Sequence, residues 1–192
     1  YAEYDSNMKD LRKAAGKVSG TDFQLDKSDI KTNADGSKTY SDRLKSAISN
    51  VKDLVNEYNE TSDFLRENKS LGKGVQQLTT EFSDTTYKAD SYAKMGITVD
   101  AKTGKMSVNE SRLARALTDS PAQSEAILGK GGLAGRADRH AQYAQMARSR
   151  VIPSMEQAIG GQLNYAANML NGRSLPTMQR YSNILNLFSI YV

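Results

Sequence analysis

The chain has 192 residues, of which 38% are hydrophobic and 25% are charged. This is a low apolar content for a compact globule, and it favours an elongated helical protein with a narrow buried seam. The net charge of +4 arises from 26 basic and 22 acidic residues mixed along the chain, so a nucleic-acid partner is not indicated. The absence of cysteine excludes disulfides and thiolate metal sites. No apolar run is long enough to span a membrane.

Residues 1–40 predict an N-terminal helix followed by an irregular connection. The polar, helix-compatible segment reaches about Gly16. Asp35 and Gly36 then form a turn signal, and the residues on either side of it are compatible with short strands.

A long helix is predicted from Ser41 onward. Ser41 or Asp42 suits the N-cap position. The residues that follow recur alternately four and three positions apart, which is typical of a helix that packs along a narrow seam. The seam consists of Leu44, Ile48, Val51, Val55, Tyr58, Ser62 and Leu65, with Ser62 as a polar break. A second helix is expected from about Val75 to Lys88.

The stretch at about 96–108 interrupts this helical pattern. Ile97 and Val99 alternate with polar residues, as do Met106 and Val108, and a turn containing Gly104 lies between the two pairs. This arrangement predicts a short antiparallel hairpin. Because a two-stranded hairpin is marginally stable alone, we expect its four apolar side chains to pack on the helices. The hairpin would then fix the angle between the helices that precede and follow it.

The rest of the chain again predicts helices. Asn109 suits an N-cap, and Ser120 with Pro121 suits the start of a further helix that ends at Gly129. After Gly132 an alanine-rich seam is expected at Leu133, Ala137, His140, Ala144, Ala147 and Val151. The predicted fold class is therefore mainly α, an elongated helical bundle or coiled coil with one small β-hairpin. We expect a helical-bundle core at 41–152 and a separate C-terminal helical segment at 153–192.

No motif indicates catalysis, a cofactor or a metal. His140 is the only histidine, so it has no second histidine or cysteine with which to share a metal, and a structural or half-exposed position is expected. The loop from Asp100 to Gly104 is not a calcium loop, because Lys102 occupies a ligand position. No phosphate loop or nucleophile elbow is present. An enzyme is therefore not expected.

Two surface features raise the question of partners. The first is a group of basic residues, Arg136, Arg139, Arg148 and Arg150. It either contacts an acidic partner or forms a solvated face balanced by Asp138, and the second interpretation fits a mixed-charge chain better. The second feature is a C-terminal tail that is apolar almost all round, which must be covered by the bundle itself or by another chain. Its candidate partner-binding residues are Tyr181, Leu185, Phe188 and Tyr191.

Three segments of the chain together resemble the C-terminal region of the bacterial flagellar filament-cap family, the hook-associated proteins at the filament tip. The first is the helix segment Leu54-Val55-Asn56-Glu57-Tyr58-Asn59. The second is the hairpin signature at Gly96-Ile97, Asp100, Gly104, Met106, Val108 and Asn109-Glu110. The third comprises Ala116-Leu117, Asp119-Ser120-Pro121, Ile127-Leu128 and Gly132-Leu133-Ala134. The resemblance spans about 41–151. Met106 and Asn109 stand where the family usually has Leu and Asp, and residues 1–40 are too few for the variable β-rich domains of the family.

The resemblance implies an extracellular structural protein of the bacterial flagellum that has no cofactor. Such a protein is exported unfolded, self-assembles at the filament tip and promotes flagellin incorporation. The implied partners are further copies of itself, flagellin or other hook-associated proteins, and an export chaperone. Two alternatives are a secreted helical binding or adhesion module outside any filament, and a cytosolic helical regulator or export-chaperone partner.

Overall fold

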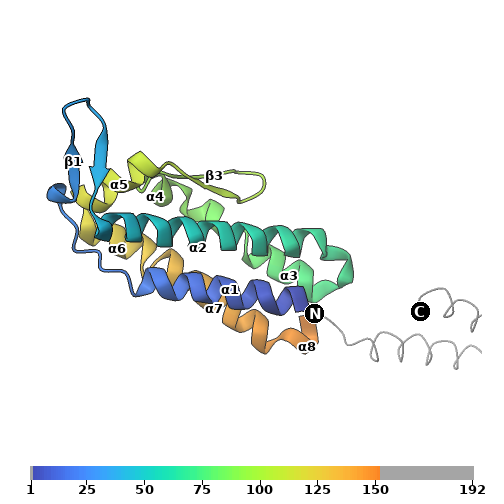
Figure 1. The fold of residues 1–192 in the computed structure, drawn as a ribbon. Coiled ribbons are helices and arrows are strands. Elements are labelled where there is room, and N and C mark those ends of the chain that lie inside the picture. The colour runs from blue at the N-terminus through green and yellow to red at the C-terminus, as the bar shows by residue number, and fades with distance from the viewer. Residues whose placement is uncertain (1, 152–192) are drawn as a thin grey trace, which may run out of the picture. The chain divides into compact units, whose positions relative to one another are not determined.

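The computed structural model describes residues 2–151 and shows a mainly helical fold (Figure 1). The expected mainly α class is confirmed, but the described residues form two small β-hairpins where one was expected. Three short 3₁₀ helices, η1, η2 and η3, connect the longer elements. In chain order the elements are α1 (Ala2–Ser19), η1 (Lys27–Asp29), β1 (Ile30–Thr32), β2 (Lys38–Tyr40), α2 (Asp42–Glu67), η2 (Lys69–Leu71), α3 (Lys73–Glu81), η3 (Asp84–Lys88), α4 (Ala89–Lys94), β3 (Ile97–Val99), β4 (Met106–Val108), α5 (Glu110–Asp119), α6 (Pro121–Leu128), α7 (Leu133–Met146) and α8 (Arg148–Val151).

Helix α2 is the element around which the others are arranged. It packs against α1 along much of its length, against α3 near its C-terminal end, and also contacts β4 and α5 (Figure 1). It begins as the sequence predicts, because the Ser41 side chain accepts a hydrogen bond from the Leu44 N–H and satisfies an unpaired donor of the first turn. All seven residues of the predicted seam are buried, and Leu54 is buried beside them.

Small residues bring α1 and α7 close together. Ala14 and Ala15 of α1 are buried, as are Ala137, Ala141 and Ala144 of α7. The Tyr4 hydroxyl of α1 donates to the carbonyl of Ala144 at 2.7 Å. The alanine-rich seam of α7 is therefore confirmed as a close-packing surface, with one correction. His140 lies at the edge of this seam, where it faces η3, and Ala141 is buried in the seam instead.

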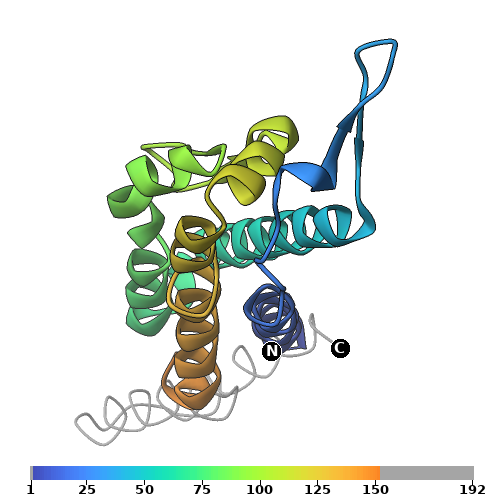
Figure 2. The same cartoon turned by 90° about the vertical axis from the view of Figure 1, so that its left-hand side faces the viewer.

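Two antiparallel hairpins interrupt the helices. The expected hairpin forms from β3 and β4, with Ile97 opposite Val108 and Val99 opposite Met106. A second hairpin, β1–β2, closes over the predicted turn at Asp35-Gly36, and Gly36 adopts the positive φ of +81° that this turn requires. Residues 31–39 are exposed, and the hairpin projects from the helical body (Figures 1 and 2).

The helix predicted from Val75 to Lys88 is wrong in its second half. Helix α3 ends at Glu81, and the chain continues through η3 into α4. The Ser83 hydroxyl donates to the carbonyls of Thr79 and Thr80, and the Thr86 hydroxyl donates to the carbonyl of Ser83. These short side chains compete with the helical backbone ladder and favour the tighter 3₁₀ turn.

At the N-terminal end, α1 runs past Gly16 to Ser19. Among the described helices, none combines the length and apolar character needed to cross a bilayer. The expected boundary near residue 152 stays a prediction, because residues 152–192 lie outside the described part of the chain.

Candidate functional site

The β3–β4 hairpin is fastened to α2 by the side chain of Asn59. The amide Nδ2 donates to the Met106 carbonyl at 2.7 Å, and the Met106 N–H donates to Oδ1 at 2.9 Å. Met106 faces Val99 at a position of the antiparallel ladder where the backbone groups point away from the partner strand. The Asn59 amide therefore pairs with the outer edge of β4 as a neighbouring peptide group would.

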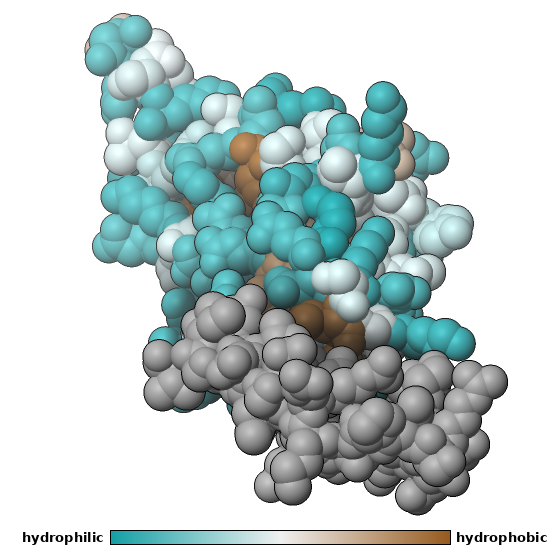
Figure 3. All heavy atoms as spheres, turned by 90° about the vertical axis from the view of Figure 1, so that its right-hand side faces the viewer, coloured by the Kyte–Doolittle hydropathy of each residue, from teal (hydrophilic) through white to brown (hydrophobic). Residues whose placement is uncertain are grey.

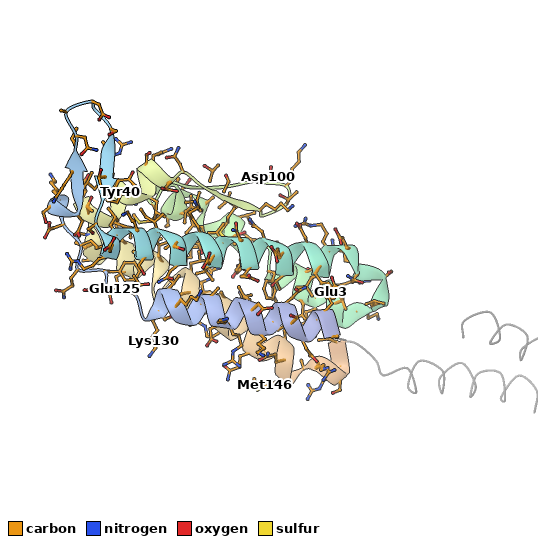
Figure 4. All side chains as sticks on the ribbon, in the orientation of Figure 1. Glu3, Tyr40, Asp100, Glu125, Lys130 and Met146 are labelled. Carbon is orange, nitrogen blue, oxygen red and sulfur yellow. The ribbon has the colours of Figure 1, made fainter. Side chains whose placement is uncertain are left out.

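Contacts from α2 also hold the turn of this hairpin. The Arg66 guanidinium donates to the Thr103 carbonyl at 2.7 Å, and Lys105 forms an ion pair with Asp63 at 2.6 Å. Within the turn, Asp100 accepts the backbone N–H groups of Lys102 and Thr103 (Figure 4). The turn is therefore ordered by its own hydrogen bonds and needs no ion.

Gly96 allows the hairpin to sit directly on α5. Its φ is +73°, and a Cβ at this position would lie 2.6 Å from the Cβ of Arg112. Ile97 and Met106 are buried against the helices, whereas Val99 and Val108 are half-buried. The expected packing of the hairpin on the bundle is confirmed most fully for Ile97 and Met106.

A second polar connection joins α2, η3 and α7 through Asp84. The Tyr58 hydroxyl donates to Asp84 Oδ1 at 3.0 Å. The other oxygen, Oδ2, binds the Arg136 guanidinium and lies 2.9 Å from His140 Nε2. The Phe82 ring lies between those of Tyr58 and His140, with 5.3 Å between ring centroids on each side. His140 is thus a structural, half-buried residue, as its sequence context predicts.

Burial and pairing set the protonation states of this network. Burial alone raises the pKa of Asp84, but the hydrogen bonds from His140 and Arg136 and the charge of Arg136 outweigh it and leave the pKa below its ordinary value. Burial, and then the nearby Asp84 charge, raise the pKa of Tyr58 well above its ordinary value. At neutral pH the network therefore contains an Asp84 carboxylate, an Arg136 cation and a neutral Tyr58 hydroxyl that donates.

A shallow depression opens over this network, between η3 and α7. Its lining residues are Glu81, Lys88, Arg136, Arg139, His140 and Tyr143. Within residues 2–151 no three metal-binding side chains cluster. Nor does the lining of the depression contain paired carboxylates or a nucleophile beside a base.

The predicted site residues have different outcomes. Tyr181, Leu185, Phe188 and Tyr191 lie outside the described residues, so their role stays a prediction. The expected solvated arginine face is wrong for Arg136, which is largely buried and paired with Asp84. Asp138 pairs with Arg12 of α1 instead of balancing these arginines, and Arg148 pairs with Asp5.

Sequence reasoning did not identify Asp84 or the role of Asn59. A signal for Asp84 existed, because Arg136 and His140 are four residues apart and share one face of α7, which invites a buried acid on the neighbouring element. Asn59 belongs to the Tyr-Asn pattern of the family resemblance. The two residues of that pattern act in different places: Tyr58 anchors η3 and Asn59 anchors β4.

The chain matches a known protein family. The family model described as "Flagellar hook-associated protein 2 C-terminus" matches residues 64–184, which is more than half of the chain. No curated protein and no solved structure matches the chain. The matched region includes the hairpin, Asp84 and all of α7. The chain therefore belongs to the flagellar hook-associated protein 2 family, a family of structural, non-enzymatic proteins of the bacterial flagellum.

Proposed function

We propose that this protein is a subunit of the cap at the tip of the flagellar filament, where it self-assembles and promotes the incorporation of flagellin. The observation that carries the proposal is the family match over residues 64–184. The proposed partners are further copies of the chain, flagellin or other hook-associated proteins, and an export chaperone. The proposed location is extracellular, at the flagellum.

The construction of the body supports this role. In a self-assembling subunit, the positions of the surface elements determine which surface it presents to its neighbours. The β3–β4 hairpin is held on α2 by both backbone groups of Met106, and η3 is held between α2 and α7 by Asp84. These ties use buried or half-buried hydrogen bonds, which restrain the relative positions of the elements more than apolar packing alone does.

We also propose that the C-terminal segment at 153–192 forms a separate helical unit that takes part in assembly. Its candidate contact residues are Tyr181, Leu185, Phe188 and Tyr191, which follow helical spacing on an apolar tail. The family match extends to residue 184 and so includes Tyr181.

The experiment is complementation of the source bacterium after deletion of the gene. Cells without the protein should export flagellin into the medium and carry few filaments, and the full chain supplied in trans should restore filaments. A matched variant in which Tyr181, Leu185, Phe188 and Tyr191 are all replaced with serine should fail to restore them. If the deletion strain builds normal filaments, the cap proposal is wrong. Normal filaments together with loss of surface adherence would favour the secreted binding module instead.

A further inference from the structure

Exposed aromatic, apolar and basic side chains gather on η3 and α7. Residues 2–151 contain four large hydrophobic residues that are exposed: Leu71, Tyr87, Tyr143 and Met146. Tyr87 belongs to η3, and Tyr143 and Met146 lie three residues apart on α7, where Figure 4 shows Met146. Such side chains stand out on a surface that is otherwise largely hydrophilic, as Figure 3 illustrates for one face.

The same surface also carries the basic side chains of Lys88, Arg136 and Arg139. Arg136 is neutralised by Asp84, but Lys88 and Arg139 form no ion pair within residues 2–151. Only Glu81 adds negative charge to the lining of the depression. Lys88, Arg139 and Tyr143 line the depression, and the exposed Tyr87 and Met146 adjoin them in the chain, Tyr87 directly before Lys88 and Met146 three residues after Tyr143. We name these five residues the basic face. Aromatic residues, methionine and arginine are the types enriched in protein interfaces.

The opposite charge lies on another part of the same molecule. Asp53, Glu57 and Glu60 follow one another along α2 at spacings of four and three residues, and Asp10 of α1 lies beside them. Of the four, only Asp53 has an ion pair within the described part of the chain, with Lys17. We name these four residues the acidic stripe. Partial burial, and then repulsion from the other three acids, raise the pKa of Glu57. The nearby Lys13 lowers it but does not outweigh them, so the negative charge of the stripe is incompletely balanced within the subunit.

The two surfaces cannot meet within one subunit. The acidic stripe lies on α2 and α1, whereas the basic face lies on η3 and α7. Helix α1 lies on one side of α7, and α3, which leads into η3, lies on the other side (Figure 2). A contact between unlike surfaces on different subunits is heterologous, and repetition of such a contact generates rings or open assemblies.

We propose that the basic face of one subunit docks on the acidic stripe of a second copy of this chain. This proposal rests on the proposed cap function and names the surfaces that would join its subunits. Charge complementarity guides the encounter and fixes the register, while Tyr87, Tyr143 and Met146 provide the apolar contact area. A second copy is the occupant because this chain itself supplies the complementary stripe.

Charge reversal in the full-length chain tests the proposal. The basic-face variant is Lys88→Glu/Arg139→Glu, and the acidic-stripe variant is Glu57→Lys/Glu60→Lys. Sedimentation equilibrium at low salt should show self-association of the wild type and at least about tenfold weaker association of each variant alone, because like charges would then face each other. An equimolar mixture of the two variants should regain association. The basic face of one variant is now negative and meets the acidic stripe of the other variant, which is now positive.

A matched control tests whether any charge reversal of this size on the surface weakens association. The variant Lys31→Glu/Lys38→Glu makes the same change of charge on the exposed β1–β2 hairpin and should associate like the wild type. Circular dichroism should show that all the variants are folded. A monomeric wild type, equal association of the wild type and both variants, or a mixture no better than either variant alone would each overturn the proposal. In a further outcome, the wild type restores filaments to the deletion strain while both variants associate as strongly as the wild type does. That result would show that these surfaces are wrong and would leave the cap function standing.

Discussion

Replacing Asn59 with alanine should lower the free energy of unfolding by about 3 kcal/mol. The substitution removes two hydrogen bonds to Met106, each contributing roughly 1 kcal/mol, and leaves the Met106 N–H and C=O only partly accessible to water, which adds a desolvation cost. The better helix propensity of alanine returns about 0.5 kcal/mol of this loss. For a chain of this size, 3 kcal/mol corresponds to a decrease in Tm of about 9 °C.

The assay is thermal unfolding followed by circular dichroism, with Asn56→Ala as the matched control. Asn56 lies three residues earlier on the same helix but is exposed, so its replacement should leave Tm unchanged or raise it slightly. Hydrogen exchange should locate the effect, because the Met106 amide would lose its acceptor and exchange faster in Asn59→Ala alone. Equal Tm values for the two variants, or an unchanged exchange rate at Met106, would refute the reasoning about the hairpin.

Three further predictions concern the packed body. Asp84→Asn should reduce the free energy of unfolding in urea by about 3 kcal/mol at pH 7, because Arg136 loses its anionic partner in a largely buried position; a change below 1 kcal/mol would contradict this. Since the folded state lowers the pKa of Asp84, the wild type should keep this stability above about pH 4 and lose it as the pH falls through the lowered pKa, whereas Asp84→Asn should show a weaker acid dependence. Ile97→Ser should cost about 3 kcal/mol through a buried cavity and an unpaired hydroxyl, while Thr98→Ser on the exposed side of the same strand should cost little. An unchanged melting temperature for Ile97→Ser would mean that the hairpin is not part of the core.

Where the sequence pattern is local, it predicts the fold well. The seam of α2 repeats over more than 20 residues and is bounded by a capping serine, so both the helix and its buried side follow from periodicity alone. The β3–β4 hairpin follows from alternation around a turn with Gly104, whose φ is +70°. The break after Glu81 was harder to predict, because Ser83 and Thr86 decide it through side-chain hydrogen bonds that leave no periodic signal.

The candidate site depends on contacts between distant parts of the chain. Asp84 binds Arg136 and His140, which are 52 and 56 residues further along the chain, and Asn59 binds Met106 across 47 residues. Local spacing carries no information about such pairs. The sequence therefore does not distinguish these polar residues from the many others before the helices are packed. The same is true of the basic face, which α7 and η3 form only when they lie side by side.

The most direct test of the central claim is to locate the protein on intact cells of the source bacterium. Immunogold labelling of the full-length chain, viewed by electron microscopy, should place gold at the distal tips of the flagellar filaments and leave the filament shafts unlabelled. Label spread over the cell body, or retained inside cells that carry complete filaments, would contradict the account of this chain as a subunit of the filament cap.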